Sequence, residues 1–378
     1  MEFHVYENAR AACEAAGVLI AAQITRKGDS VLGLATGSTP IPAYEMLAQW
    51  YDRGVIDFDR VRTFNLDEYV GIDHKNPLSY HAFMQEHLFS KVNLRPENVH
   101  LPSGNGAADV IFRLALAVRP RRALLPAPTF AEYAAALDTV GCEVTQFALD
   151  AANDFAVTDA FINAVTPETD VVFLCQPNNP TGQVTPPALV EKLLHRCAAC
   201  GAALVVDECF LDFLPDRDTL TAKTFLHEAT NLIILKAFTK LYAMAGVRLG
   251  YALCSNADLL AKMQAAGQPW AVSSLAQAAG IAALQETAYA DAVRALIADQ
   301  RPKMAAGLRA LGLYVIDGQA NYLLFKAPAD FGEALRQHGA VVRSCANYPG
   351  LDAAWYRTAV RTAAENDQLL QIMGEVLA

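Results

Sequence analysis

The stretch LVVDECF, residues 204–210, places an acidic pair directly after a run of aliphatic residues. A short apolar run of this kind predicts a strand that is buried on both faces of a parallel sheet. Asp207 then stands at the end of a buried strand, where a carboxylate needs a cationic or hydrogen-bonding partner. The carboxyl ends of such strands are also where α/β sheets bind their ligands.

Strands and helices alternate on both sides of this stretch. The segments RALLPAP (122–128), CEVTQFAL (142–149), DVVFLCQP (170–177) and NLIILKAF (231–238) predict strands, and AADVIFRLALAV (107–118) and TFAEYAAALDTVG (129–141) predict helices. Helical periodicity dominates from about residue 256 to 313, and the C-terminal residues mix short strands with helices. Alternation of this kind indicates a parallel sheet covered by helices, followed by a smaller α+β unit.

Two further strand ends carry polar residues that suggest chemistry. CQPNNPTG (175–182) presents Asn179, and FTKLYAMAGVRLGY (238–251) presents Lys240, preceded by Thr239 and followed eight residues later by Arg248. A lysine and an arginine at this spacing more often form a solvated face, but a lysine at a strand end also suits a Schiff base beside an anchored phosphate. A protonated pyridine nitrogen would give Asp207 its missing partner. Each residue alone has a structural explanation, but the ordered set is very unlikely to be accidental.

The composition excludes several classes of partner. The chain has 378 residues, 53% of them hydrophobic and 19% charged, with a formal net charge of −10. A negative chain is repelled by a nucleic-acid backbone and by an anionic membrane surface. No apolar run reaches the roughly 18–20 residues of a membrane span, and the N-terminus is too polar for a signal peptide. We expect a cytoplasmic protein with neither nucleic acid nor membrane as a partner.

The cysteines do not form a metal-binding pattern. Eight are present, and only Cys197 and Cys200 make a C-x-x-C pair, without a second pair at zinc-finger spacing. Helix-borne structural thiols are the favoured interpretation, with redox or metal chemistry as the alternative. The sequence predicts no metal site.

The strand-end residues together resemble the fold-type I pyridoxal-phosphate enzymes of the class I/II aminotransferase family. The resemblance implies a Schiff base at Lys240, a contact of Asp207 with the pyridine nitrogen and a hydrogen bond from Asn179 to the phenolic oxygen. It further implies that Phe130 in APTF stacks on the cofactor ring and that Arg357 in YRTAVR clamps the substrate carboxylate. The residues implied for the cofactor phosphate are Thr239, Arg248 and the helix start in GNGAAD, namely Gly106, Ala107 and Ala108.

Within this family, residues 103–378 are similar throughout to the threonine-phosphate decarboxylases. The similarity includes RPRRALLPAPTFAEY, VVDECFLDF, GQANYLLFK and RSCANYPGLDAAWYRTAVRTAAEN. It accounts for Phe210, which stands where many aminotransferases have a tyrosine. Ala237 departs from the wider family too, because many members have a phosphate-binding hydroxyl there. The resemblance implies decarboxylation of threonine phosphate to aminopropanol phosphate, a cobalamin-pathway step, by a homodimer that takes a phosphorylated amino acid. The alternative is a histidinol-phosphate-type aminotransferase, since the sequence does not show which substrate bond stands perpendicular to the ring.

The first hundred residues carry different motifs. LGLATGSTP (32–40) sets Thr36, Gly37, Ser38 and Thr39 in a strand-to-helix turn that could hold a phosphate, although a turn without ligand is equally common. TFNLDEY (63–69) sets Asp67 near the end of the next predicted strand, where a carboxylate could act as a general base.

These motifs resemble the N-terminal part of glucosamine-6-phosphate deaminase. The resemblance implies that the Thr36–Thr39 loop holds a sugar phosphate and that Asp67 moves a proton during isomerisation. That family also needs a downstream Gly-x-Gly-x-x-Gly-His segment, and no such segment follows residue 102. Deaminase activity is therefore disfavoured, and these residues are interpreted as vestigial.

The two resemblances meet within ENVHLPSGNGAADVIF, residues 97–112. We interpret the chain as a chimera of a partial doubly wound α/β segment (1–102), a pyridoxal-phosphate-binding large domain (103–265) and a small C-terminal domain (266–378). Residues 1–102 stand in place of the N-terminal stretch with which the pyridoxal-phosphate family normally covers its active site. A fusion that binds phosphate ligands without turnover is thus a further hypothesis.

Overall fold

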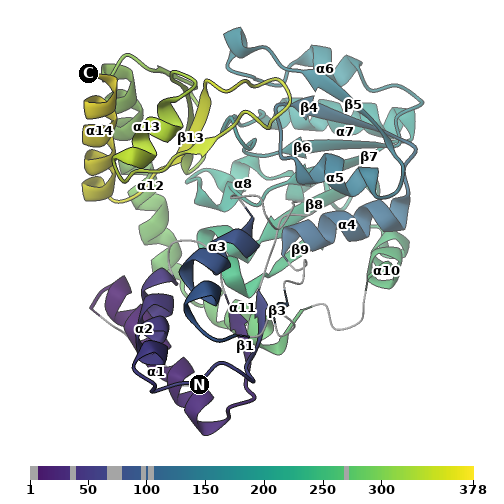
Figure 1. The fold of residues 1–378 in the computed structure, drawn as a ribbon. Coiled ribbons are helices and arrows are strands. Elements are labelled where there is room, and N and C mark those ends of the chain that lie inside the picture. The colour runs from purple at the N-terminus through teal and green to yellow at the C-terminus, as the bar shows by residue number, and fades with distance from the viewer. Residues whose placement is uncertain (1–6, 35–39, 66–78, 95–98, 101–105, 268–271) are drawn as a thin grey trace. The chain divides into compact units, whose positions relative to one another are not determined.

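The computed structural model describes residues 7–34, 40–65, 79–94, 99–100, 106–267 and 272–378 (Figure 1). By their internal contacts the residues form two compact units. The first comprises Met1–Gly104 and Gly246–Arg248, and the second comprises Asn105–Ala245 and Leu249–Ala378. Each unit is described below by itself.

The first unit contains a parallel sheet in the order β1-β2-β3. Its elements are α1 (Ala9–Arg26), β1 (Val31–Leu34), α2 (Ile41–Asp52), β2 (Arg62–Asn65), α3 (Tyr80–His87) and β3 (Val99–His100). Tyr44, Leu47, Phe58 and Met84 are almost fully buried in its core. Thr36, Gly37, Ser38, Thr39 and Asp67 lie outside the described residues, so the predicted phosphate loop and general base stay predictions.

The second unit is built on a six-stranded sheet in the order β5-β4-β6-β7-β8-β9 (Figure 1). Its strands are β4 (Arg122–Ala127), β5 (Glu143–Ala148), β6 (Val171–Cys175), β7 (Ala203–Asp207), β8 (Leu232–Ala237) and β9 (Gly250–Leu253). The helices that accompany them are α4 (Ala107–Val118), α5 (Glu132–Asp138), α6 (Asp159–Asn163), α7 (Pro187–Cys200), α8 (Arg217–Leu220), α9 (Phe238–Leu241) and α10 (Ala257–Ala265).

Alternating strand residues bury both faces of this sheet, as continuous apolar strands require. Phe173, Val205 and Ile233 pack with α4 and α5 on one face. Val172, Leu204 and Ile234 pack with α6 and α7 on the other face. Two helix layers thus exclude water from the middle of the sheet and leave its strand ends as the places where polar side chains meet.

Strand β9 is the one part of this sheet that the sequence did not indicate. It pairs with β8 in the antiparallel direction at the edge of the sheet, and its residues are partly buried except for Tyr251, which is exposed. An edge strand of four residues lacks the continuous apolar run that marked its neighbours. The sequence therefore predicts no element at GYAL, residues 250–253.

The C-terminal part of the second unit is an antiparallel sheet in the order β10-β11-β13-β12 with helices packed against it. Its elements are α11 (Ser274–Ala283), α12 (Thr287–Ala310), β10 (Tyr314–Val315), β11 (Tyr322–Lys326), α13 (Phe331–Gln337), β12 (Arg343–Ser344), β13 (Trp355–Ala359) and α14 (Ala363–Leu377). Leu308, Phe325 and Tyr356 belong to its core. This is the small α+β unit that the C-terminal sequence predicted.

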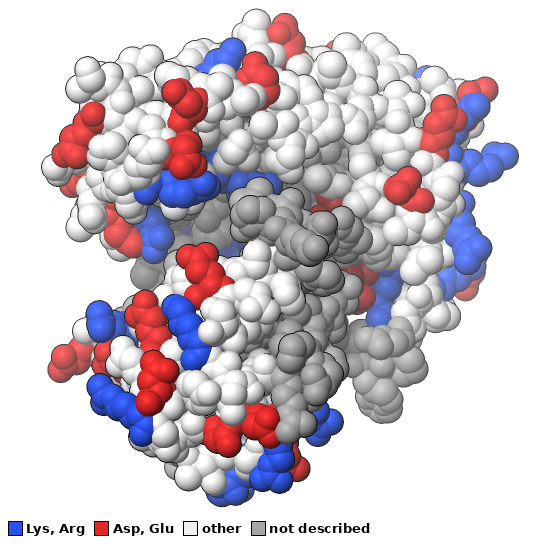
Figure 2. All heavy atoms as spheres, in the orientation of Figure 1, with Lys and Arg blue, Asp and Glu red and all other residues white. Residues whose placement is uncertain are grey.

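Charged side chains of both signs are visible in Figure 2, separated by broad uncharged areas. Basic and acidic side chains of the described residues stand beside one another there, without a broad patch of one sign. None of the described helices is long and apolar enough to cross a membrane.

Buried thiols predict how the stability of the fold depends on pH. Burial raises the pKa of the Cys197 thiol on α7 from 9.0 to about 12, and burial also raises that of Cys175 at the end of β6 to about 12. Between pH 9 and 12 the unfolded chain loses these protons while the folded chain keeps them. The free energy of unfolding must therefore fall with rising pH, by about 1.4 kcal/mol per pH unit for each such thiol.

Urea unfolding between pH 8 and pH 10.5 checks this expectation with Cys197→Val, which keeps a small apolar side chain and removes the ionisable group. In the variant, the free energy of unfolding should fall less steeply with pH than in the parent chain, by about 1.4 kcal/mol per pH unit, because one buried thiol is absent. Equal slopes for the variant and the parent chain would contradict the assignment.

Candidate active site

The carboxyl ends of four neighbouring strands bring the predicted residues of the second unit to one edge of the sheet. Phe130 follows β4, Asn179 follows β6, Asp207 ends β7, and Lys240 lies on α9 directly after β8. The chain passes from β4 outward to β5 and then back across to β6, so the strand order reverses between β4 and β6. Ligands of open α/β sheets bind at such a reversal.

Asp207 is a buried carboxylate whose two oxygens are held by different parts of the fold. It is 5% exposed. The Tyr133 hydroxyl donates to Oδ2 over 2.6 Å, and the Cys209 backbone N–H donates to Oδ1 over 3.0 Å. Since a carboxylate has about four acceptor positions, two donors fix its orientation and leave room for another.

The first turn of α4 lies close to the edge strand β9. Gly106, the residue before the helix, has φ 97° and ψ −169°, a conformation open essentially to glycine alone. No side chain of the described residues caps this helix start, so the amides of Ala107 and Ala108 keep the donor character of a helix N-terminus. A Cβ at Gly250 would approach the Ala107 nitrogen to 2.5 Å, so glycine is needed there for the two backbones to meet.

Lys240 opens on a cavity of about 310 Å³ within the second unit. Its Nζ lies 5.1 Å from the centre of the Phe210 ring. Two arginines of the C-terminal sheet, Arg343 on β12 and Arg357 on β13, line the same cavity, and they are paired opposite each other in the register of the two strands. The cavity thus combines one amine with two guanidinium groups.

Arg357 also connects the small sheet to the loop that follows β6. Its Nη1 donates to Asn179 Oδ1, and the Tyr348 hydroxyl donates to the same oxygen over 3.3 Å. The Arg357 guanidinium stacks on the Tyr322 ring at 4.9 Å, and the Tyr322 hydroxyl donates to the Asn178 carbonyl over 2.9 Å. The Asn179 oxygen is therefore used as an acceptor within the fold, and the amide nitrogen is the part of this side chain that can donate to a ligand.

The structure brings together most, but not all, of the predicted residues. Phe130 makes an edge contact with Tyr133, with ring centres 5.5 Å apart, and Thr239 is buried on α9. Arg248 belongs by its contacts to the first unit, so its predicted role at the phosphate stays a prediction. Its left-handed backbone, φ 56°, marks a tight turn before β9.

Several residues at this edge were not found from the sequence, although the quoted stretches contain three of them. Tyr133 stands in APTFAEY, Tyr322 in GQANYLLFK and Tyr348 in RSCANYPG. The only available signal was a tyrosine close to a recognised motif. Their hydrogen bonds join residues more than 70 positions apart in sequence, for example 74 for Tyr133 and Asp207.

Behind the site lies a buried cluster of charges. Lys236 on β8 is 2% exposed, and its Nζ lies 2.8 Å from Asp212 Oδ1 and 3.3 Å from Glu208 Oε2. The Ala222 amide and the Thr221 hydroxyl also donate to Glu208. Burial alone would lower the pKa of Lys236, but the carboxylates of Asp212 and Glu208 raise it on balance, so the amine is charged. The cluster joins the end of β7 to β8, and Lys240 lies four residues beyond Lys236.

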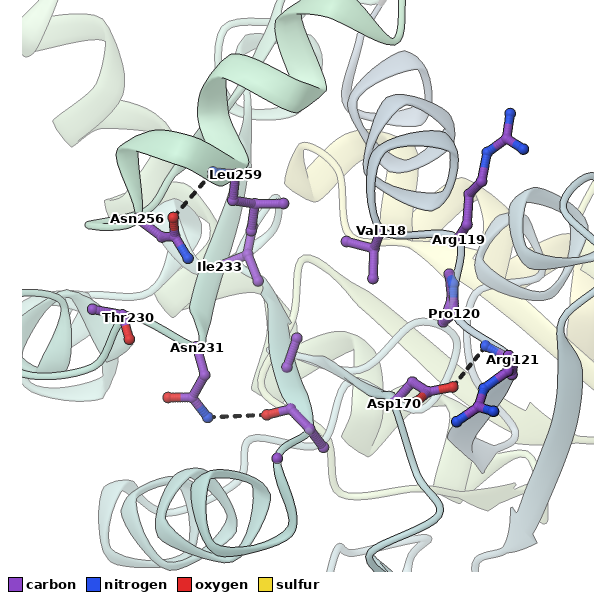
Figure 3. A pocket seen from close by; sticks show the side chains of 13 residues that line it. Val118, Arg119, Pro120, Arg121, Asp170, Thr230, Asn231, Ile233, Asn256 and Leu259 are labelled. Carbon is purple, nitrogen blue, oxygen red and sulfur yellow. Dashed lines mark hydrogen bonds between the residues drawn. The ribbon is translucent and has the colours of Figure 1, made fainter.

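A larger cavity of about 470 Å³ lies at the opposite, amino edge of the same sheet (Figure 3). Three of its polar side chains bond the backbone of the fold itself. Asp170 accepts from the Arg121 amide over 2.6 Å, Asn231 donates to the Ala202 carbonyl over 3.1 Å, and Asn256 accepts from the Leu259 amide over 3.0 Å. Because these groups serve the loops they belong to, the smaller cavity at Lys240 is the better candidate for an active site.

Comparison with known proteins shows the family to which the chain belongs. Residues 73–373 match the family aminotransferase class I and II. The chain is 38% identical over 279 residues to threonine-phosphate decarboxylase of Salmonella typhimurium, covering 73% of this chain and 76% of that protein.

Solved structures of the same family share the fold. Histidinol-phosphate aminotransferase from Clostridium acetobutylicum superposes with a TM-score of 0.68 at 26% identity, covering 72% of this chain and 82% of the other. Histidinol-phosphate aminotransferase from Sinorhizobium meliloti, solved in complex with pyridoxal 5'-phosphate, gives 0.63 at 23% identity, covering 72% and 76%.

The chain therefore belongs to the aminotransferase class I and II family. It has the fold-type I architecture, and it is a pyridoxal-phosphate-dependent enzyme.

Removing the buried cation tests the role of the charge cluster. Lys236→Met leaves Glu208, whose side chain is fully buried, without its positive partner. Because an uncompensated buried charge is costly, we expect the free energy of unfolding to fall by about 3–5 kcal/mol. Chemical denaturation measures the loss, and Lys303→Met, which removes an exposed ion pair with Asp299, serves as the control.

A double variant provides a further test. When Glu208→Gln is combined with Lys236→Met, part of the lost free energy of unfolding should return, because both charges are then absent. A cost below 1 kcal/mol for Lys236→Met alone, or a double variant less stable than the single one, would contradict the pairing.

Proposed function

We propose that this enzyme decarboxylates threonine phosphate to aminopropanol phosphate. The observation that carries the proposal is the cavity in which Arg343 and Arg357 stand beside Lys240. Two guanidinium groups suit a substrate with two anionic groups, a carboxylate and a phosphate, and the amine suits an amino acid. The 38% identity to a threonine-phosphate decarboxylase supports the same substrate class.

The residues at the strand ends fit the cofactor. We assign the Schiff-base linkage to Lys240, the ring nitrogen to Asp207, the phenolic oxygen to the amide of Asn179 and the ring face to Phe130. The cofactor phosphate is assigned to Thr239, Arg248 and the α4 start at Gly106, Ala107 and Ala108. The fit rests on two observations: Asp207 is a buried acid with acceptor positions left over, and the amides at the start of α4 have no capping side chain among the described residues.

The chain's own groups then orient the substrate and handle the proton. When bound, pyridoxal phosphate supplies an electron sink for the bond that breaks. Arg357, which Asn179 and Tyr322 hold in place, binds the carboxylate. The bond between Cα and the carboxylate carbon breaks, its electron pair stays with Cα, and carbon dioxide leaves. Lys240 Nζ then gives Cα a proton, and the product is an amine that retains its phosphate.

Arg343 is assigned to the substrate phosphate. It is exposed at the rim of the cavity, and its nearest described partner is Asn347 Oδ1 at 3.4 Å. A guanidinium that is held by one long hydrogen bond keeps most of its donors for a ligand.

A histidinol-phosphate-type aminotransferase is the second candidate. The solved structure with a TM-score of 0.68 is an enzyme of that name, and a cavity with one amine and two arginines also suits its phosphorylated amine substrate. The two reactions differ in whether carbon dioxide or a proton leaves Cα. An inactive fusion that binds phosphate ligands remains the alternative if neither reaction occurs.

We further propose that residues 1–102 are a deaminase-like segment fused to the large domain (103–265) and the small domain (266–378). The separation of the two compact units between Gly104 and Asn105 supports a junction here, whereas the family match begins earlier, at residue 73. An assay with glucosamine 6-phosphate should show no deamination, because the chain lacks the catalytic His segment. We also propose that the protein is cytoplasmic and that it forms a homodimer. Analytical ultracentrifugation can test the dimer.

Product analysis with the holoenzyme tests the main proposal. Threonine phosphate should release carbon dioxide and yield aminopropanol phosphate without any added keto acid. Amino transfer from histidinol phosphate to a keto acid, with no release of carbon dioxide from threonine phosphate, would establish the second candidate instead.

The Arg343→Ala variant tests how the phosphate is recognised. We expect KM for threonine phosphate to rise about tenfold or more, because a charge-assisted hydrogen bond of about 1.5–3 kcal/mol is lost. The rate with unphosphorylated threonine should not change. Arg336→Ala, at an exposed ion pair with Glu333, is the matched control. Equal losses with both substrates would contradict the assignment.

A further inference from the structure

Tyr133 is a fully buried tyrosine that the proposed reaction does not use directly. It lies in the first turn of α5 and is 0% exposed. Its ring stacks on Phe173 with centres 4.7 Å apart and planes at 23°, and it meets the edge of Phe130 at 5.5 Å and 83°. Aromatic neighbours on two sides fix the ring, so its hydroxyl can point in only one direction.

That hydroxyl is bonded to Asp207 Oδ2. The separation of 2.6 Å falls within the range of charge-assisted O–H···O⁻ hydrogen bonds, which are about twice as strong as neutral ones. Burial and the nearby Asp207 charge raise the pKa of Tyr133 well above 10, so the phenol keeps the proton that it donates. Tyr133 is therefore the donor of this hydrogen bond, and the Asp207 carboxyl group is the acceptor.

The other groups around Asp207 are neutral donors or a more distant cation. The Cys209 amide donates to Oδ1, and burial raises the pKa values of both Cys175 and Cys209, so these thiols are un-ionised near neutral pH. Lys240 acts on the same region, because its charge opposes the rise in the pKa of Cys209. Among the described residues, two side chains form hydrogen bonds with Asp207: the Tyr133 hydroxyl, which donates to Oδ2, and the Cys209 thiol.

We propose that Tyr133 is a positioning residue that fixes Asp207 Oδ2 in place for the ring nitrogen and thereby favours the proton of the Asp207–cofactor pair on that nitrogen. The inference rests on the proposed function, in which Asp207 faces that nitrogen. In such a pair the proton can reside on the nitrogen or on the carboxylate. A hydrogen bond from Tyr133 stabilises the carboxylate form and so favours the protonated ring, which is the better electron sink. Tyr133 also touches Phe130, so one side chain supports both the nitrogen and the stacking face.

The test is Tyr133→Phe, loaded with pyridoxal phosphate labelled with ¹⁵N in the ring. At neutral pH the ¹⁵N resonance should move from the position of a protonated pyridine toward that of a neutral one, and the Kd for the cofactor should rise about tenfold. The matched control is Tyr356→Phe, which removes the hydroxyl of another buried tyrosine, bonded to the carbonyls of Pro328 and Ala329. Its ¹⁵N resonance should not move. An unchanged resonance in Tyr133→Phe would overturn the inference.

Asp207→Asn separates this inference from the proposed function. A shift of the ¹⁵N resonance in Asp207→Asn but not in Tyr133→Phe would overturn the role of Tyr133 alone. No shift in Asp207→Asn would overturn the placement of the cofactor. If Tyr133→Phe does not fold, 3-fluorotyrosine at position 133 keeps both ring and hydroxyl, and its ¹⁹F resonance should move when the cofactor binds. A resonance that stays in place would contradict the coupling.

Discussion

A carboxylate buried at the end of β7 is the constraint around which the second unit is arranged. Asp207 is 5% exposed, and an isolated charge in such a place would be costly. The Tyr133 hydroxyl from α5 and the Cys209 backbone amide donate hydrogen bonds to its two oxygens and fix their directions. A carboxylate that is held in this way, with acceptor positions left over, is prepared for a cationic ring nitrogen. The surrounding helices and strands exclude water from Asp207 and its hydrogen-bond donors.

The same edge of the sheet shows how residues from distant parts of the chain come to act together. Two layers of helices leave the strand ends as the place where polar groups meet, and the small C-terminal sheet adds Arg343 and Arg357 from β12 and β13. Arg357 bonds Asn179, so the arginine that we propose for the substrate carboxylate is connected to the loop after β6. Lys236, Glu208 and Asp212 connect the end of β7, where Asp207 stands, to β8, which leads into the helix that carries Lys240. The site is thus supported by charge pairs beneath it as well as by apolar packing.

Sequence reasoning predicted the parts of this structure that depend on local pattern. The helix at residues 107–118 and the buried strands that end at Cys175 and Asp207 follow from apolar runs and their flanking residues. The edge strand β9 was missed because its partly buried and exposed residues carry no such pattern. The partners of Asp207 and Asn179 were missed because they arise from tertiary contacts: Tyr133 and Asp207 are 74 positions apart in sequence, and Asn179 and Arg357 are 178 positions apart. A single sequence shows which strand ends carry polar residues but not which distant side chains complete them.

The central claim, that Lys240 is the residue that binds pyridoxal phosphate beside Asp207, can be tested without any turnover. The holoenzyme is reduced with borohydride, which makes the lysine linkage permanent, and its peptides are mapped by mass spectrometry. The account predicts that the pyridoxyl group is found on Lys240 and that Lys240→Ala carries none at an equivalent position. Labelling of surface lysines such as Lys303 in place of Lys240, or identical labelling in the parent chain and in Lys240→Ala, would contradict it.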